Sequence, residues 1–60
     1  MASHLLLVPG PRGYALEERD GEPPAAGDRL DIGGRRFVVT KVGPSPLPAD
    51  TRPCAHLQSA

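Results

Sequence analysis

Residues 27–42 read GDRLDIGGRRFVVTKV, and this stretch decides the fold. Two glycines, Gly33 and Gly34, separate two runs in which apolar and polar side chains alternate. Both central residues of a type I′ turn need a positive φ, which glycine adopts without steric cost. The pattern therefore predicts a tight β-hairpin with strands at residues 29–32 and 35–42.

The same turn fixes which residues of the two strands stand opposite one another. Asp31 is expected to face Arg36 as a cross-strand pair of opposite charge. Because side chains alternate with period two, the other face of the hairpin becomes apolar. The residues predicted on that inner face are Leu30, Ile32, Phe37 and Val39.

The second strand of this hairpin also carries apolar residues on its outer face, where Val38 and Val42 alternate with Thr40. Two explanations remain open. Either the strand curls so that both faces are partly covered, as in a small barrel, or the outer face contacts another chain.

Glycine and proline divide the rest of the chain into short pieces, and no window holds an apolar pattern of helical period. Runs rich in Leu, Val and Tyr predict three further strands, at residues 4–8, 13–19 and 54–58. We therefore expect one all-β domain over residues 1–60, a small five-stranded barrel or meander, with residues 1–3 and 59–60 frayed.

The hairpin at residues 27–42 resembles one found in SH3-like small β-barrels, where a Gly-Asp opens a strand, a glycine turn follows, and an aromatic-x-Val strand leads out. This resemblance implies an SH3-like barrel. SH3 domains that bind proline-rich peptides use an aromatic-lined groove, whereas this chain has only Tyr14 and Phe37. More loosely, the chain resembles short uncharacterised proteins of actinobacteria, which implies a bacterial source.

Composition restricts the function classes. Seven basic and seven acidic residues cancel, so no global field attracts the chain to nucleic acid or anionic lipid. A single cysteine excludes an intramolecular disulfide and fits a reducing compartment, so we expect a cytoplasmic protein. No stretch approaches the roughly 20 apolar residues that a membrane helix needs, so no membrane association is expected.

Cys54 and His56 raise the question of chemistry, because an imidazole can take the proton of a thiol nucleophile. Two residues apart on a strand, their side chains share a face but diverge. His4 and Asp50 would be needed to complete a four-ligand zinc site. We expect no enzyme activity, metal or cofactor, with Cys54 a small buried residue and both histidines on the surface.

Two binding functions remain. The first is a non-enzymatic interaction module that binds a protein partner or a second copy of itself, through an open strand edge or the outer face. The outer-face residues are Val38, Thr40 and Val42. The alternative is a nucleic-acid-binding barrel whose hairpin contacts phosphates. The basic residues for that role are Arg29, Arg35, Arg36 and Lys41.

Overall fold

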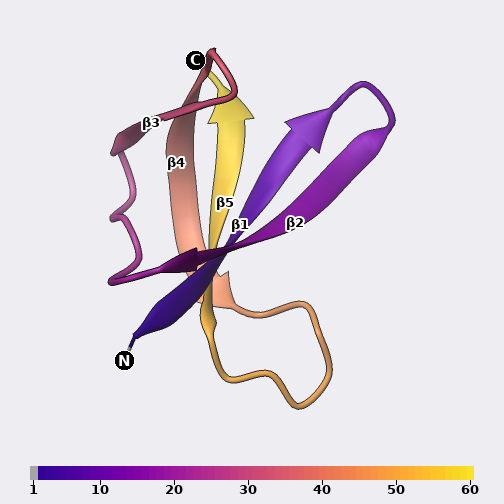
Figure 1. The fold of residues 1–60 in the computed structure, drawn as a ribbon, viewed down its shortest axis with the longest axis vertical. Helices are drawn as coiled ribbons and strands as arrows, with labels where there is room; N and C mark the ends of the chain where they lie inside the picture. The colour runs from indigo at the N-terminus through magenta and orange to yellow at the C-terminus, as the bar shows by residue number, and fades with distance from the viewer. Residues whose placement is uncertain (1) are drawn as a thin grey trace.

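The computed structural model describes residues 2–60, and these residues form one sheet of five strands without a helix (Figure 1). Each strand end lies within two residues of the end expected from the sequence. The strands are β1 (Ser3–Gly10), β2 (Gly13–Asp20), β3 (Arg29–Ile32), β4 (Arg35–Pro44) and β5 (Pro53–Ser59).

The strand order is β2-β1-β5-β4-β3. Every neighbouring pair is antiparallel except β1 and β5, which run parallel with Leu6 opposite Ala55. The sheet curls into a half-barrel, so the prediction of an all-β, barrel-like fold is confirmed. A simple meander is excluded because the first strand lies beside the last. Strands β2 and β3 remain as the two unjoined edges.

The β3–β4 hairpin has the predicted turn and register. Gly33 and Gly34 take φ values of 58° and 78°, the left-handed conformation that the tight turn requires. Asp31 stands opposite Arg36, and their charged groups lie 3.8 Å apart at the surface. The prediction of an apolar inner face and a charged outer face on this hairpin is therefore confirmed.

One irregularity interrupts the pairing of β4 with β5. Val39 lies opposite Leu57 and Lys41 lies opposite His56, so Thr40 has no partner across the strand. An extra residue of this kind is a β-bulge, and it reverses the alternation of side chains beyond it.

The bulge separates two residues that were expected to share a face. Val38 pairs with Gln58 on the convex side of the sheet, whereas Val42 pairs with Ala55 on the concave side. The expected outer face that combined Val38, Thr40 and Val42 is therefore wrong as a single surface. The sequence pattern assumed unbroken alternation, which the bulge at Thr40 removes.

The hydrophobic core occupies the concave side of the half-barrel. Its five buried members come from β1, β4 and β5, and none is more than 3% exposed. Burying an aliphatic or aromatic side chain contributes roughly 1.5–3 kcal/mol, so these residues dominate the favourable side of folding. The core residues are Leu6, Phe37, Val39, Ala55 and Leu57, with Val8, Leu30 and Ile32 packed against them.

A second buried region lies on the convex side, where Leu5 and Cys54 are opposite each other and almost fully buried. The loop between β4 and β5 lies on this side, because Arg52 forms ion pairs with Glu18 of β2 and with Asp50 of the loop itself. The prediction that Cys54 is a small buried residue is confirmed.

The sheet extends nearly to both ends of the described residues. β1 begins at Ser3, β5 ends at Ser59, and the N–H of Ala60 donates a 3.1 Å hydrogen bond to the carbonyl of Arg36. The fraying expected for Met1 lies outside the described residues. Within residues 2–60 there is no helix of the length and apolar character needed to span a membrane.

Candidate binding groove on the open side of the half-barrel

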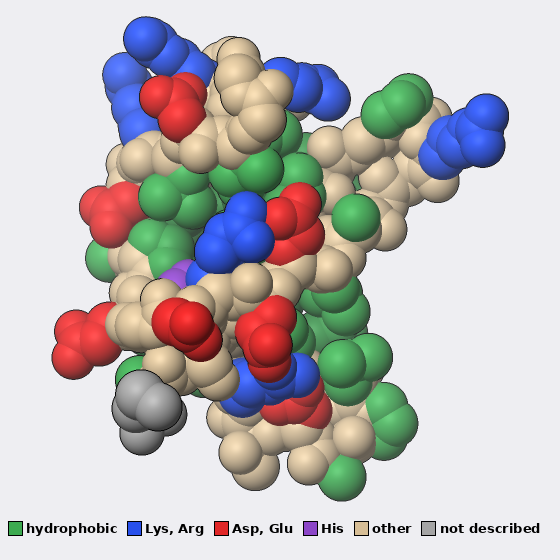
Figure 2. All heavy atoms as spheres, in the orientation of Figure 1, with side chains coloured by type: hydrophobic (Ala, Val, Ile, Leu, Met, Phe, Trp, Pro, Cys, Tyr) green, Lys and Arg blue, Asp and Glu red, His purple; other side chains and the backbone are tan. Residues whose placement is uncertain are grey.

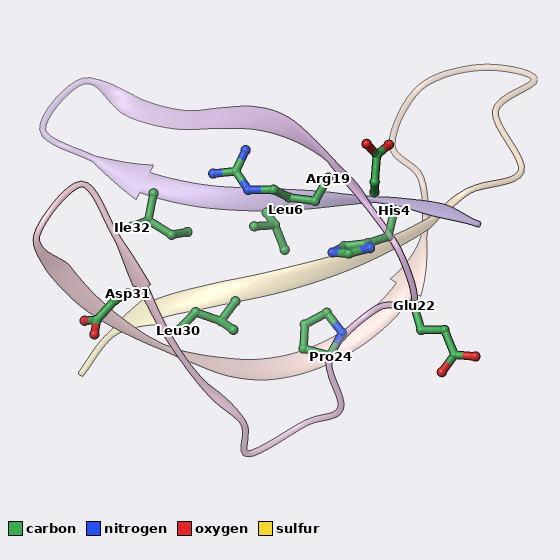
Figure 3. Close-up of a pocket in the computed structure, with 9 residues that line it drawn as sticks. His4, Leu6, Arg19, Glu22, Pro24, Leu30, Asp31 and Ile32 are labelled. Carbon is green, nitrogen blue, oxygen red and sulfur yellow. The ribbon is translucent and has the colours of Figure 1, made fainter. Parts of the chain in front are cut away.

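A cavity of about 340 Å³ opens on the concave side, between the β1–β2 hairpin and strand β3 (Figure 3). It exists because β2 and β3 are both edges and do not pair across the opening. Leu6 on one side and Leu30 and Ile32 on the other point into this gap, whereas Asp31 and Glu22 point away from it (Figure 3). The lining residues are His4, Leu6, Arg19, Asp20, Glu22, Pro24, Leu30, Asp31 and Ile32.

The floor of the groove is apolar. Leu6 is 3% exposed and belongs to the core, while Leu30 and Ile32 are half-buried and pack against it. Pro24, in the connection that leads from β2 to β3, closes one end (Figure 3). The groove is therefore the part of the core that the unclosed sheet leaves open.

His4 supplies a polar group beside this apolar floor. Its side chain is on the same side of β1 as Leu6, only 6% of the residue is exposed, and Nδ1 lies 3.0 Å from the carbonyl oxygen of Gly21. A carbonyl oxygen only accepts, so Nδ1 donates this hydrogen bond. The expectation of a surface histidine is wrong for His4, because β1 turns it inward.

The rim of the groove is acidic. Asp20, Glu22 and Asp31 are exposed around the opening. The only basic lining residue is Arg19, and its guanidinium is 2.7 Å from the carboxylate of Glu17. Figure 2 shows several acidic side chains near the visible part of a histidine, with one basic side chain directly beside it. The groove lining therefore carries three carboxylates and one guanidinium, and the guanidinium is already paired with Glu17.

Three of the four predicted nucleic-acid contacts share the convex side of the sheet. Arg29 and Arg36 lie on that side with Val38, and Lys41 lies there opposite His56. Arg35 is on the other side, where its guanidinium carbon is 5.6 Å from the centre of the Phe37 ring. The bulge brings Lys41 onto the same side as the two arginines.

The predicted partner-binding residues lie apart from the groove. Val38 is half-buried on the convex side, and Val42 is 38% exposed on the concave side. The hydroxyl of Thr40 donates to the carbonyl of His56 at 3.2 Å, which ties the bulge to β5. A binding role for these three residues stays a prediction.

The residues considered for chemistry do not come together. Cys54 and His56 face the convex side, and His4 faces the concave side. Burial raises the pKa of the Cys54 thiol, which disfavours the reactive thiolate. Among residues 2–60 there is no group of three or more potential ligands placed to hold a metal ion.

The groove is not predicted by the sequence pattern as a whole, although the first strand carries one signal for it. His4, Leu6 and Val8 alternate along the first strand, which predicts that the histidine shares the inward face of the two apolar residues. The opening itself depends on the distance and orientation between β2 and β3. These strands are not paired, so no pairing pattern in the sequence indicates how they lie.

Comparison with protein-family models, with curated proteins and with solved structures found no match for this chain.

Proposed function

We propose that the chain is a non-enzymatic interaction module that binds an extended segment of a protein partner in the groove between β2 and β3. The observation that supports this proposal is the open concave side, where a cavity of about 340 Å³ has an apolar floor. That volume is at the small end of the range for ligand pockets, so it suits one or two side chains of a peptide.

The lining favours a particular chemistry in the bound segment. Aliphatic side chains fit the floor formed by Leu6, Leu30 and Ile32. A lysine or arginine in the segment would find the carboxylates of Asp20 and Glu22 on the rim. Nε2, the second ring nitrogen of His4, would contact a polar group of the ligand. An extended segment with alternating aliphatic and basic residues therefore fits best.

The test is an amide NMR titration with the peptide acetyl-Val-Lys-Val-Lys-Val-amide, with the peptide in which glutamate replaces lysine as its counterpart. We expect saturable amide chemical-shift changes at His4, Leu6 and residues 30–32 with the lysine peptide and none with the glutamate peptide. Glu22→Gln should weaken this binding, while Gln58→Lys makes the same change in net charge on the convex side and should not weaken it. Absence of shifts at the groove at millimolar peptide would refute the proposal.

Nucleic-acid binding is the second candidate, supported by the position of Arg29, Arg36 and Lys41 on one side of the sheet. Asp28 and Asp31 lie among these residues and reduce the local positive field. A mixed-sequence oligonucleotide at low salt would discriminate. Shifts centred on the convex side of β3 and β4 that disappear steeply with added salt would support this candidate over the peptide groove.

The proposal includes the cellular setting. A single cysteine that is buried as a free thiol suits a reducing compartment, so we propose a cytoplasmic location. Expression of a tagged protein, followed by detection of the tag in separated cell fractions, would test the location.

A further inference from the structure

Strand β2 is an edge of the sheet. One side of it pairs with β1, and along its other side no strand of the described chain lies next to it. Its two halves differ in character. Glu17 to Asp20 are all charged, which is how natural edge strands avoid pairing with other chains. Gly13 to Leu16 carry no charge, and Tyr14 is 69% exposed and Leu16 is 38% exposed.

The register of the β1–β2 hairpin shows which backbone groups are available. A two-residue turn makes Gly10 and Gly13 a hydrogen-bonded pair, and hydrogen-bonded and non-hydrogen-bonded pairs then alternate along the strands. The N–H and C=O groups of Tyr14 and Leu16 therefore point away from β1. On the opposite edge of the hairpin, Pro9 stands opposite Tyr14 and has no N–H to offer.

The β1 side of the hairpin is occupied by β5, and Pro9 beyond that pairing offers no N–H, whereas the first half of β2 is unprotected. We propose that β2 pairs antiparallel with β2 of a second copy, with the two-fold axis at Leu16. Tyr14 then lies opposite Glu18 of the second copy, and Gly13 lies opposite Arg19. Arg12, in the turn directly before β2, brings its long side chain near Asp20 of the second copy. The two five-stranded sheets become one continuous sheet.

Charge selects this register over its neighbours. Moving the axis to Glu17 or to Glu18 would place that carboxylate directly against its own copy, which is unfavourable. Moving it to Ala15 would set Arg12 against Glu18, which already pairs with Arg52. With the axis at Leu16, Arg12 meets Asp20, and Asp20 forms no ion pair within residues 2–60.

The pairing uses Asp20 of the groove rim and leaves the apolar floor and Glu22 free. The side chains of Tyr14 and Leu16 lie on the convex side with Pro9 and Leu7, whereas the groove opens on the concave side. One pair of strands forms an interface smaller than a standard stable complex, so a weak, concentration-dependent dimer is expected.

Sedimentation equilibrium of the whole chain from micromolar to millimolar concentration tests the proposal, and the expected result is a monomer–dimer equilibrium. Arg12→Glu and Asp20→Arg should each weaken the dimer about tenfold, since two symmetry-related pairs change from attraction to repulsion. The double variant should return to within about threefold of the original affinity if the two residues are paired. Lys41→Glu is the matched control and should leave the affinity unchanged.

A second pair of variants tests the backbone contribution. Leu16→Pro removes an N–H that points away from β1, a position where an edge strand tolerates proline, and should abolish the dimer. Leu16→Ala keeps that N–H and should dimerise, though more weakly. A chain that stays monomeric at millimolar concentration would overturn the proposal, as would charge variants without rescue. A folded Leu16→Pro variant that still dimerises would overturn it too.

Discussion

Replacing Phe37 by alanine should remove most of the stability of this domain. Phe37 is 1% exposed and is the largest side chain in the core of the half-barrel. Truncating a buried phenylalanine to alanine costs about 3–5 kcal/mol, because the lost transfer free energy is joined by a cavity that the neighbours fill only in part. A chain of this size has a total stability of about 3–5 kcal/mol. The two quantities are equal in size, so the variant should be largely unfolded in buffer.

Urea denaturation followed by circular dichroism would measure the effect, with amide NMR dispersion as a check on the fold. Phe37→Leu should retain a cooperative transition and lose about 1.5 kcal/mol. Val38→Ala is the matched control, because the Val38 side chain points to the convex side. This variant should lose about 1 kcal/mol of unfolding free energy. A folded Phe37→Ala variant that loses less than about 1 kcal/mol would refute the inward orientation on which this reasoning rests.

Three further predictions concern a turn, an ion pair and the thiol. Gly34→Ala should lower the free energy of unfolding by about 1–2 kcal/mol in thermal denaturation, because φ is 78° there, and Gly34→Asn should lose less. Hydrogen bonds from Arg52 lower the pKa of Asp50 from 3.8 to about 2, so the stability this carboxylate contributes is complete above pH 3.8 and disappears as the pH falls toward 2. Asp50→Asn should remove that part of the acid dependence in urea titrations. An aromatic disulfide reagent should modify Cys54 slowly in buffer and rapidly in urea, and a fast native reaction would contradict its burial.

The strands could be predicted from the sequence because their signals are local. Alternation over a few residues and the Gly33-Gly34 turn specify the β3–β4 hairpin without reference to the rest of the chain. The parallel pairing of β1 with β5 is different, since it joins residues about 50 positions apart and no local pattern specifies it.

The candidate site was predictable only in part, for the same reason. Leu30 and Ile32 were expected to point inward, but the groove also requires His4, which comes from the first strand and is distant in sequence. The bulge at Thr40 shows a further limit. An uninterrupted run of strand-forming residues gives no sign of an extra residue, yet that one residue moves Val42 to the opposite face of the sheet.

The open side of the sheet connects stability with binding. A closed barrel of this length would pair β2 with β3 and bury Leu30 and Ile32 completely, whereas the half-barrel leaves both strands unpaired and both side chains half-buried. The folding free energy that this arrangement forgoes can be recovered when another chain covers the groove or extends the sheet. A ligand present at 100 times its dissociation constant adds about 2.7 kcal/mol to the folded state, which is comparable with the stability of the isolated domain. Partner binding should therefore appear first as a rise in the unfolding temperature, which makes thermal denaturation a suitable screen for segments that fit the groove.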